Sequence, residues 1–379
     1  MAQRGSECGV RSAGWHSFTF HIPHSTFHIP RSRQTGSLLV VTLWLIIVLA
    51  LVAIALGGYL STETRLMRYH LAHAQAKAWA KAGVYLALQR LAQDAKQADD
   101  TEPYDWLGDD WASVPHASPG MDATVWVVQM PAPGQPPEAA RHVIAIQMTD
   151  EERKLNLNAA TKTHLMGLGL PDEAAQAIID YWDVEDPSNP SPSEDQPDAQ
   201  PPYYAKDAPL VVLEELLDVP AIQERPELVP TLLGQGTVAA TNGTININTA
   251  SAEVLKALVD PNQPDVPALI DRLVNSRAGL DGQLGTSDDC LATDKTTAVT
   301  ELASCANNGE EAPVVSLLSS LPAYDVKSSV FRMVVWAETP KPSVRYRIEA
   351  IVKRKAQEEP LVEVSGEPFQ ILAWKEGPS

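Results

Sequence analysis

One uncharged run constrains this chain more than any other feature. Residues 37–60, SLLVVTLWLIIVLALVAIALGGYL, contain no Asp, Glu, Lys, Arg or His. As a helix rising about 1.5 Å per residue, these 24 residues span ~36 Å, more than the roughly 30 Å hydrocarbon core of a bilayer. The apolar region of a cleavable signal peptide is shorter, about 7 to 15 residues. The sequence therefore predicts a transmembrane helix at residues 37–60 that stays in the mature protein.

Arginines on both sides of the run bear on its orientation. Arg31 and Arg33 precede it and favour a cytoplasmic N-terminus, because positive loops are retained on that side of the membrane. Arg65 and Arg68 follow it and weaken the contrast. The favoured topology is a single pass, with the N-terminus in the cytoplasm and the rest of the chain outside.

The helix is expected to continue beyond the membrane. Residues 61–95 are rich in Ala, a strong helix former, and Gly83 is their only Gly or Pro. One helix is predicted from Ser37 to Asp94. Apolar residues recur in its second part at spacings of three and four, which supports this continuation of the membrane helix: Leu71, Ala74, Ala78, Ala82, Tyr85 and Leu88.

The rest of the chain predicts an α+β fold. Residues 121–149 contain two short β-type runs, and residues 326–375 contain three more. Residues 150–325 contain helical patterns such as PDEAAQAIIDYWD, LVVLEELLDV, SAEVLKALVD and VPALIDRLVNSR. The prediction is a long N-terminal helix and a small antiparallel sheet, interrupted by a large inserted α-helical domain.

The inserted part repeats a motif. KLNLNAATKTHLMGLGLPDEAAQAII and TININTASAEVLKALVDPNQPDVPALI both place an Asn-containing segment before a helix, a turn and another helix. This order is typical of helix-hairpin-helix or SAM-like modules. Four asparagines are expected to cap the following helix or to tie its first turn to the preceding strand: Asn156, Asn158, Asn246 and Asn248.

Helix-hairpin-helix units often bind DNA, so a membrane-anchored DNA-uptake protein is the main alternative function. Phosphate binding needs a Gly-rich hairpin with nearby Lys or Arg. Between Pro171 and Glu227 there are fifteen acidic residues and two basic ones, and the whole chain has a formal net charge of −19. This charge disfavours nucleic acid as a partner. A membrane-anchored enzyme is a third alternative, but no nucleophile and base are clustered in the sequence.

Carboxylates gather in two segments and could bind a cation. Residues 180–198 contain seven Asp and Glu, which suits Ca²⁺ because this ion takes six to eight hard oxygen ligands. A solvated acidic loop is the alternative. Asp281, Asp288 and Asp289, in GLDGQLGTSDDC, form a second and weaker candidate, with a simple turn as the alternative.

Of two cysteines in this part of the chain, one ends the second acidic segment and the other lies beyond it. Cys290 and Cys305 are expected to form a disulfide if this part of the chain lies in an oxidising compartment, and to be unrelated thiols otherwise.

The N-terminal region resembles a known family. A basic leader ending in Gly36, then an apolar helix, then an amphipathic Ala-rich helix is similar to the start of type IV pilins and of type II secretion pseudopilins. The resemblance implies that a membrane prepilin peptidase removes residues 1–36, cutting between Gly36 and Ser37, and methylates the new N-terminus. It also implies an anchor in the bacterial inner membrane and a soluble domain in the periplasm.

Most members of this family have Glu at the fifth mature position, where this chain has Val41. A missing Glu, an interrupted sheet and the segment ININTAS resemble the K family of minor pseudopilins. That resemblance implies a protein that forms the pseudopilus tip with the I and J pseudopilins, contacts other pseudopilus subunits and supports initiation of assembly. It further implies calcium, with the ligands Asp183, Asp186, Glu194 and Asp195.

Overall fold

The structure is a computed structural model of the chain. It describes residues 37–100, 104–112, 125–131, 141–183, 202–239, 243–259, 266–305, 321, 323–355 and 369–378. Two compact units are present, residues 1–64 and residues 65–379.

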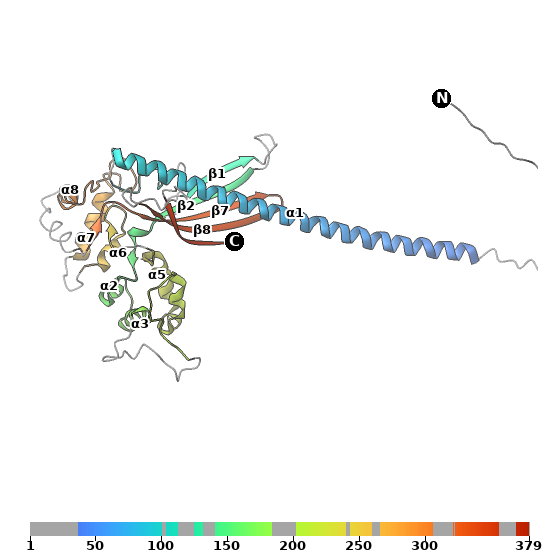
Figure 1. The fold of residues 1–379 in the computed structure, drawn as a ribbon, viewed down its shortest axis with the longest axis horizontal. Coiled ribbons are helices and arrows are strands. Elements are labelled where there is room, and N and C mark those ends of the chain that lie inside the picture. Colours follow the sequence, from blue (N-terminus) through green and yellow to red (C-terminus); the bar gives the residue numbers. More distant parts are fainter. Residues whose placement is uncertain are drawn as a thin grey trace, which may run out of the picture. The chain divides into compact units, whose positions relative to one another are not determined.

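The first described element is the helix α1, Ser37–Asp100, drawn in blue to cyan in Figure 1. It starts where the sequence predicts and runs six residues past the predicted end at Asp94. By length and composition it is the one described helix that can cross a membrane. Most of its apolar side chains between Leu38 and Leu60 are exposed, as expected of a surface that lipid covers.

A five-stranded antiparallel sheet follows, in the order β1-β2-β7-β8-β9. β2 pairs with β7, and Asp150 at the end of β2 lies opposite Phe331. Both ends of the long intervening segment therefore lie side by side, which lets an insertion leave the sheet and return without disturbing the strands. The strands are β1 Val125–Pro131, β2 Arg141–Asp150, β7 Val330–Pro340, β8 Ser343–Arg354 and β9 Phe369–Pro378.

The second part of α1 packs on this sheet. Of the apolar residues noted in the sequence, Leu71, Ala74, Ala78 and Tyr85 are exposed, whereas Ala82 and Leu88 are half-buried. The contact with the sheet is made mainly by small side chains, because these let the helix lie close to the strands. Larger residues such as Tyr85 face solvent. The buried stripe consists of Ala72, Ala76, Ala80, Val84, Ala87 and Leu91, packed with Ile144, Ile146, Met148, Phe331, Met333 and Val335 of the sheet.

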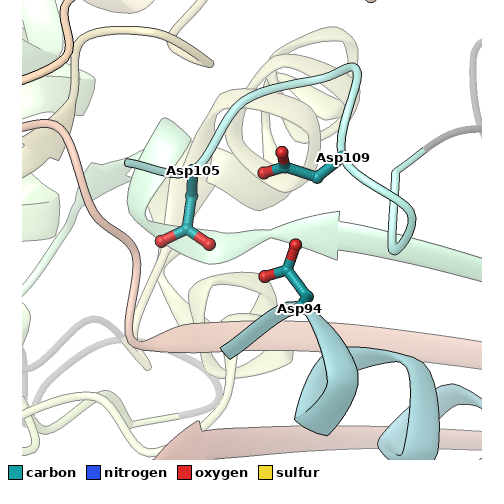
Figure 2. A group of neighbouring side chains, drawn as sticks. All are labelled: Asp94, Asp105 and Asp109. Carbon is teal, nitrogen blue, oxygen red and sulfur yellow. The ribbon is translucent and has the colours of Figure 1, made fainter. Parts of the chain in front are cut away.

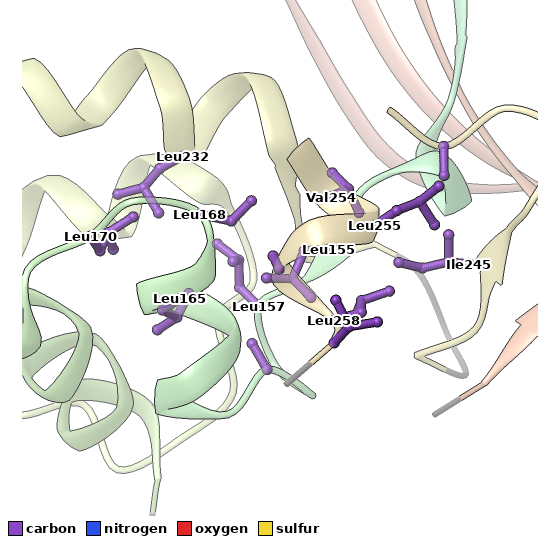
Figure 3. Close-up of a cluster of buried hydrophobic side chains, with 14 of the residues drawn as sticks. Leu155, Leu157, Leu165, Leu168, Leu170, Leu232, Ile245, Val254, Leu255 and Leu258 are labelled. Carbon is purple, nitrogen blue, oxygen red and sulfur yellow. The ribbon is translucent and has the colours of Figure 1, made fainter. Parts of the chain in front are cut away.

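The inserted segment lies between β2 and β7 and has its own core, part of which Figure 3 shows. The predicted helix over 210–219 is only a short 3-10 helix, Leu213–Asp218, because Val211 and Val212 are exposed before it and Pro220 begins the next helix. The described helices of the inserted segment are η1 Glu151–Arg153, α2 Lys162–Gly167, α3 Asp172–Trp182, η2 Leu213–Asp218, α4 Pro220–Gln223, η3 Pro226–Leu228, α5 Val229–Gln235, α6 Ala252–Ala257, α7 Val266–Arg277 and α8 Ala298–Cys305. Its short strands are β3 Leu155–Asn156, β4 Gly236–Thr237, β5 Ile245–Asn246 and β6 Tyr324–Asp325.

Gly83 of α1 lies where the helix comes closest to the sheet. A Cβ atom at this position would lie 2.6 Å from Cγ1 of Val335 and 2.8 Å from Cγ2 of Ile144. Gly83→Ala should therefore lower the melting temperature, because overpacking costs about 1–3 kcal/mol and the gain in helix propensity returns only about 1 kcal/mol. Thermal unfolding of the full chain in detergent measures this.

The matched control is Gly234→Ala in α5, where an added Cβ meets no atom within 4 Å. This variant should unfold at the same temperature as the natural chain or at a higher one. A rise in melting temperature for Gly83→Ala would contradict the assigned contact.

Candidate functional site

The inserted segment is built from two like modules that pack on each other. β3 pairs in parallel with β4, and β5 pairs in parallel with β6. Each first strand leads into a six-residue helix, α2 or α6. Asn156 and Asn158 in the first module lie 90 residues before Asn246 and Asn248 in the second. The repeated sequence motif is thus a repeated structure.

The asparagines hold their modules together but do not cap the helices. Thr161 caps α2 and Ser251 caps α6, which corrects the predicted capping role. The Asn158 side chain instead binds the backbone of a residue far away in the sequence. Its Oδ1 accepts from the Leu210 amide at 2.8 Å, and its Nδ2 donates to the Leu210 carbonyl at 2.9 Å.

Asn248 makes the same pair of bonds in the second module, to the amide and carbonyl of Ala292, both at 2.9 Å. In each module the preceding asparagine turns the chain: Oδ1 of Asn156 accepts from the Asn158 amide, and Oδ1 of Asn246 accepts from the Asn248 amide. Both motifs therefore act as clamps on another part of their own module.

The two modules meet through equivalent residues. A Cβ atom on Gly167, at the end of α2, would lie 2.6 Å from Cα of Ala257, at the end of α6. These positions are also 90 residues apart. A contact between equivalent residues is the mark of a twofold relation, as in a symmetric dimer.

The α2–α3 hairpin does not offer a phosphate site. The amides of Leu168, Gly169 and Leu170 donate to carbonyls of α2 within the hairpin. Asp172 and Glu173 occupy the first turn of α3, where their charge repels an anion from the helix N-terminus. This geometry adds to the charge argument against DNA.

A buried polar junction connects the sheet to the inserted modules. Asp150 ends β2, and its Oδ2 accepts from Ser328 Oγ and from Thr249 Oγ1, both at 2.6 Å. Its Oδ1 accepts from the Glu152 amide at 2.8 Å. Asn246 donates from Nδ2 to Ser328 Oγ at 2.7 Å. Burial raises the pKa of Asp150 to about 6, although these hydrogen bonds oppose the shift.

Next to the junction lies a compensated ion group. Glu151 is buried and pairs with Lys154 at 2.8 Å and with Arg332 at 2.8 Å. Arg332 also pairs with Glu349 of β8. Burial alone would raise the pKa of Glu151, but the two cations outweigh it and lower the pKa to about 2. This group therefore stays charged over the physiological range.

Three further aspartates come together at the end of α1, and Figure 2 shows their carboxylates pointing toward one another. Asp94 of α1, Asp105 and Asp109 each place an oxygen within 4.8 Å of the others, and all three are buried. Arg354, at the end of β8, already supplies a cation: it donates to Asp94 at 2.9 Å and to Asp105 at 3.1 Å.

These aspartates were not predicted from the sequence. Asp105 and Asp109 lie within a Trp-containing stretch, YDWLGDDW. Its mixture of acidic and large apolar residues was the one local sign that these aspartates could be buried. Arg354 lies about 250 positions away, and nothing in the local sequence connects it with them.

The structure places only part of the predicted calcium segment. Asp183 follows α3 directly as its C-terminal cap, and its amide donates to the carbonyl of Ile179. Asp186, Glu194 and Asp195 lie outside the described residues, as does the cleavage residue Gly36. Ser37 is the first residue of α1.

The second predicted metal segment is held by its own hydrogen bonds. Oδ2 of Asp288 accepts from the amides of Leu280 and Asp281, and Oδ2 of Asp289 accepts from the Gly285 amide at 2.6 Å. Among the described residues, only Asp94, Asp105 and Asp109 bring three ligand atoms within 4.8 Å of one another. The loop ends at Cys290, which the structure joins to Cys305 of α8 in a disulfide.

Comparisons with known proteins identify the fold. No family model matches the sequence, and no curated protein matches it. Among solved structures, the chain is similar to a chain in the crystal structure of the GspK-GspI-GspJ complex from the Type 2 Secretion System of enterotoxigenic Escherichia coli. The TM-score is 0.54 at 19% sequence identity, and the match covers 83% of this chain and 99% of that chain. The chain therefore has a GspK-like α+β fold.

The paired asparagine clamps make a direct test possible. Asn248→Asp keeps the shape but removes the donor to the Ala292 carbonyl and introduces a carboxylate at a buried position. We expect it to lower the free energy of unfolding by about 2 kcal/mol or more, because a buried polar group loses its partner. Denaturant unfolding of the full chain provides the measurement.

Asn158→Asp is the matched control, since it changes the equivalent clamp at a half-buried position. It should cost clearly less, because water can solvate the new carboxylate. An equal decrease in the free energy of unfolding for both variants would contradict the prediction, because it would show that burial of Asn248 does not determine the effect.

Proposed function

We propose that this chain is a minor pseudopilin of a bacterial type II secretion system and takes part in the tip complex of the pseudopilus with I- and J-type partners. The observation that carries the proposal is the sheet interrupted between β2 and β7 beneath a long N-terminal helix, a fold matched over 99% of a chain in the GspK-GspI-GspJ structure. The partners named in that structure are the partners proposed here.

The first unit supports a membrane-anchored form of such a subunit. Residues 37–60 form the exposed apolar part of α1, long enough to span a bilayer. In this proposal the N-terminus lies in the cytoplasm and the second unit in the periplasm. Prepilin peptidase cuts between Gly36 and Ser37 and methylates Ser37, so that α1 begins at the new N-terminus.

Val41 supports a place at the tip. A protonated N-terminal amine that enters an apolar filament core needs a neutralising partner, because an unpaired buried charge costs several kcal/mol. Val41 presents no carboxylate to the amine of a subunit ahead of it. A subunit with nothing ahead of it has no such need, and it is suited to start the filament.

The test is co-expression of the full chain with the I- and J-type pseudopilins of the same secretion system and with prepilin peptidase. After extraction in mild detergent, affinity isolation of this chain should recover both partners in one complex, and N-terminal sequencing should begin at Ser37. A Gly36→Glu variant serves as the control for processing and should keep its leader. Recovery of DNA without either pseudopilin would overturn the proposal in favour of a DNA-uptake protein.

We also propose that the second unit binds calcium through Asp183, Asp186, Glu194 and Asp195. The chemistry of this donor set supports it, because several carboxylates close together in the sequence match the hard and flexible coordination of Ca²⁺ better than that of Mg²⁺. The alternative loop, Asp281 to Asp289, is less suited, because its carboxylates accept hydrogen bonds from its own turn.

Millimolar Ca²⁺ should raise the melting temperature of the full chain, whereas the same concentration of Mg²⁺ should not. Binding to the folded state alone at a hundredfold excess over Kd stabilises by about 2.7 kcal/mol. Asp186→Asn should abolish the Ca²⁺ effect, and Asp288→Asn should leave it intact. The reverse pattern would assign the site to the second loop, and no Ca²⁺ effect in the natural chain would refute calcium binding.

A further inference from the structure

The aspartate cluster at the end of α1 joins three parts of the second unit. Asp94 belongs to α1, and Asp105 and Asp109 belong to the segment 104–112 (Figure 2). Arg354, which donates to this group, ends β8. Asp105 also accepts from the Ser328 amide at 2.7 Å, next to β7. The segment is thus fastened between the helix and the sheet by charged groups.

Charge in the cluster is unbalanced. Arg354 donates to Asp94 and to Asp105, but within the described part of the chain Asp109 accepts from neutral donors, the Trp106 amide at 2.8 Å and Nε1 of Trp111 at 3.0 Å. Three ionised carboxylates against one guanidinium would leave two negative charges in a buried group. Burial of uncompensated charge costs several kcal/mol per ion, so the group must bind protons or open to water.

We propose that this cluster is a proton-dependent latch: protons on Asp94 and Asp109 keep the segment 104–112 closed against α1 and the sheet, and loss of these protons releases it. The latch acts within the second unit and does not depend on the proposed secretion role.

The direction of titration agrees with this geometry. Burial, followed by the charge of Asp105, raises the pKa of Asp94 to about 7, against the opposing effect of Arg354. Burial, followed by the charge of Asp94, raises the pKa of Asp109 to about 8. Both values exceed the ordinary 3.8, so the folded state binds more protons than the unfolded one. Their contribution to stability is complete below the ordinary pKa and is lost as the pH rises through about 7 to 8.

The charged groups around the cluster reinforce this direction. Burial raises the pKa of Asp150 to about 6 and that of Glu152 to about 7, and the charge of Asp105 contributes to both shifts. Arg90 donates to the Asp110 carbonyl at 3.3 Å. The charged and titratable groups that face the cluster from α1, the segment, β2, η1 and β8 are Arg90, Asp94, Asp105, Asp109, Asp110, Asp150, Glu152 and Arg354.

Opening of the latch would uncover the core of the second unit. Trp111 is 1% exposed and meets Phe331 of β7 edge to face, with ring centroids 5.0 Å apart. Its indole nitrogen donates to Asp109, so the same carboxylate that holds the proton also orients this ring. Release of Asp109 would therefore free the aromatic side chain that closes this end of the α1–sheet core.

Hydrogen exchange of the full chain in detergent, read by mass spectrometry, tests the latch. Labelling times are scaled so that intrinsic exchange is equal at about pH 6 and about pH 9, on either side of the expected transition. Amides of residues 104–112 should lose protection about tenfold or more at the higher pH, whereas amides of α7 should change little. Equal protection of 104–112 at both values would overturn the proposal.

Two neighbouring substitutions give a matched comparison. Asp109→Asn keeps an acceptor for Trp106 and Trp111 but cannot ionise, so the loss of protection at high pH should become smaller, with Asp94 as the remaining titrating group. Asp110→Asn makes the same chemical change at an exposed position, and the pH dependence should persist because the charge of Asp110 is the smallest of the effects on the pKa of Asp94. If Asp109→Asn does not fold, Asp94→Asn should show the same reduction in the pH dependence.

Three results would refute the latch. Full pH dependence in the foldable variant would show that these protons do not control the segment. Loss of the dependence in Asp110→Asn would show a general charge effect. Restoration of protection by millimolar Ca²⁺ at the higher pH in the Asp186→Asn variant, which lacks the calcium effect proposed above, would show that the cluster takes a metal cation in place of protons.

Discussion

The carboxylate of Asp150 is the constraint on which the rest of the second unit depends. It ends β2 at the point where the chain leaves the sheet, and it accepts from Ser328, just before the chain returns as β7. It also accepts from Thr249 in the second inserted module. One buried side chain thus joins the two ends of the insertion where it leaves and re-enters the sheet. The register of β2 with β7 begins at this point, with Asp150 opposite Phe331. Removing such an acceptor would leave buried donors without partners, which costs more than the bond itself contributes.

The inserted modules use the same device twice on their own scale. Asn158 and Asn248 each bind an amide and a carbonyl of one distant residue, as a strand neighbour would. Each module has a parallel strand pair of only two residue pairs, and one asparagine side chain supplies the backbone hydrogen bonds that a further strand would make. The near contact of Gly167 with Ala257 brings the two helices together at equivalent points, so that one apolar core serves both modules.

What the sequence could predict depended on local periodicity. The uncharged run, the Ala-rich continuation, the alternating strands and the helices α3, α6 and α7 all rest on patterns of a few consecutive residues, and these elements are present. Hydrophobicity alone does not identify the buried face of α1, because Leu71 and Tyr85 are exposed while the smaller Ala76 and Ala80 are buried against the sheet. Propensity carries no information on how near a neighbour must come.

Long-range polar partners escaped prediction for a different reason. An exposed and a buried aspartate look alike in a sequence, and Asp109 and Asp110 are adjacent residues with opposite environments. A large excess of acidic residues suggests an acidic surface, but several of these carboxylates are buried inside the second unit. Ser328 donates from its amide to Asp105 and from its hydroxyl to Asp150. The aspartate cluster and the base of the insertion are therefore linked through one residue, and the charge of Asp105 contributes to the raised pKa of Asp150. Such coupling requires both groups to be buried together, which only the folded chain achieves.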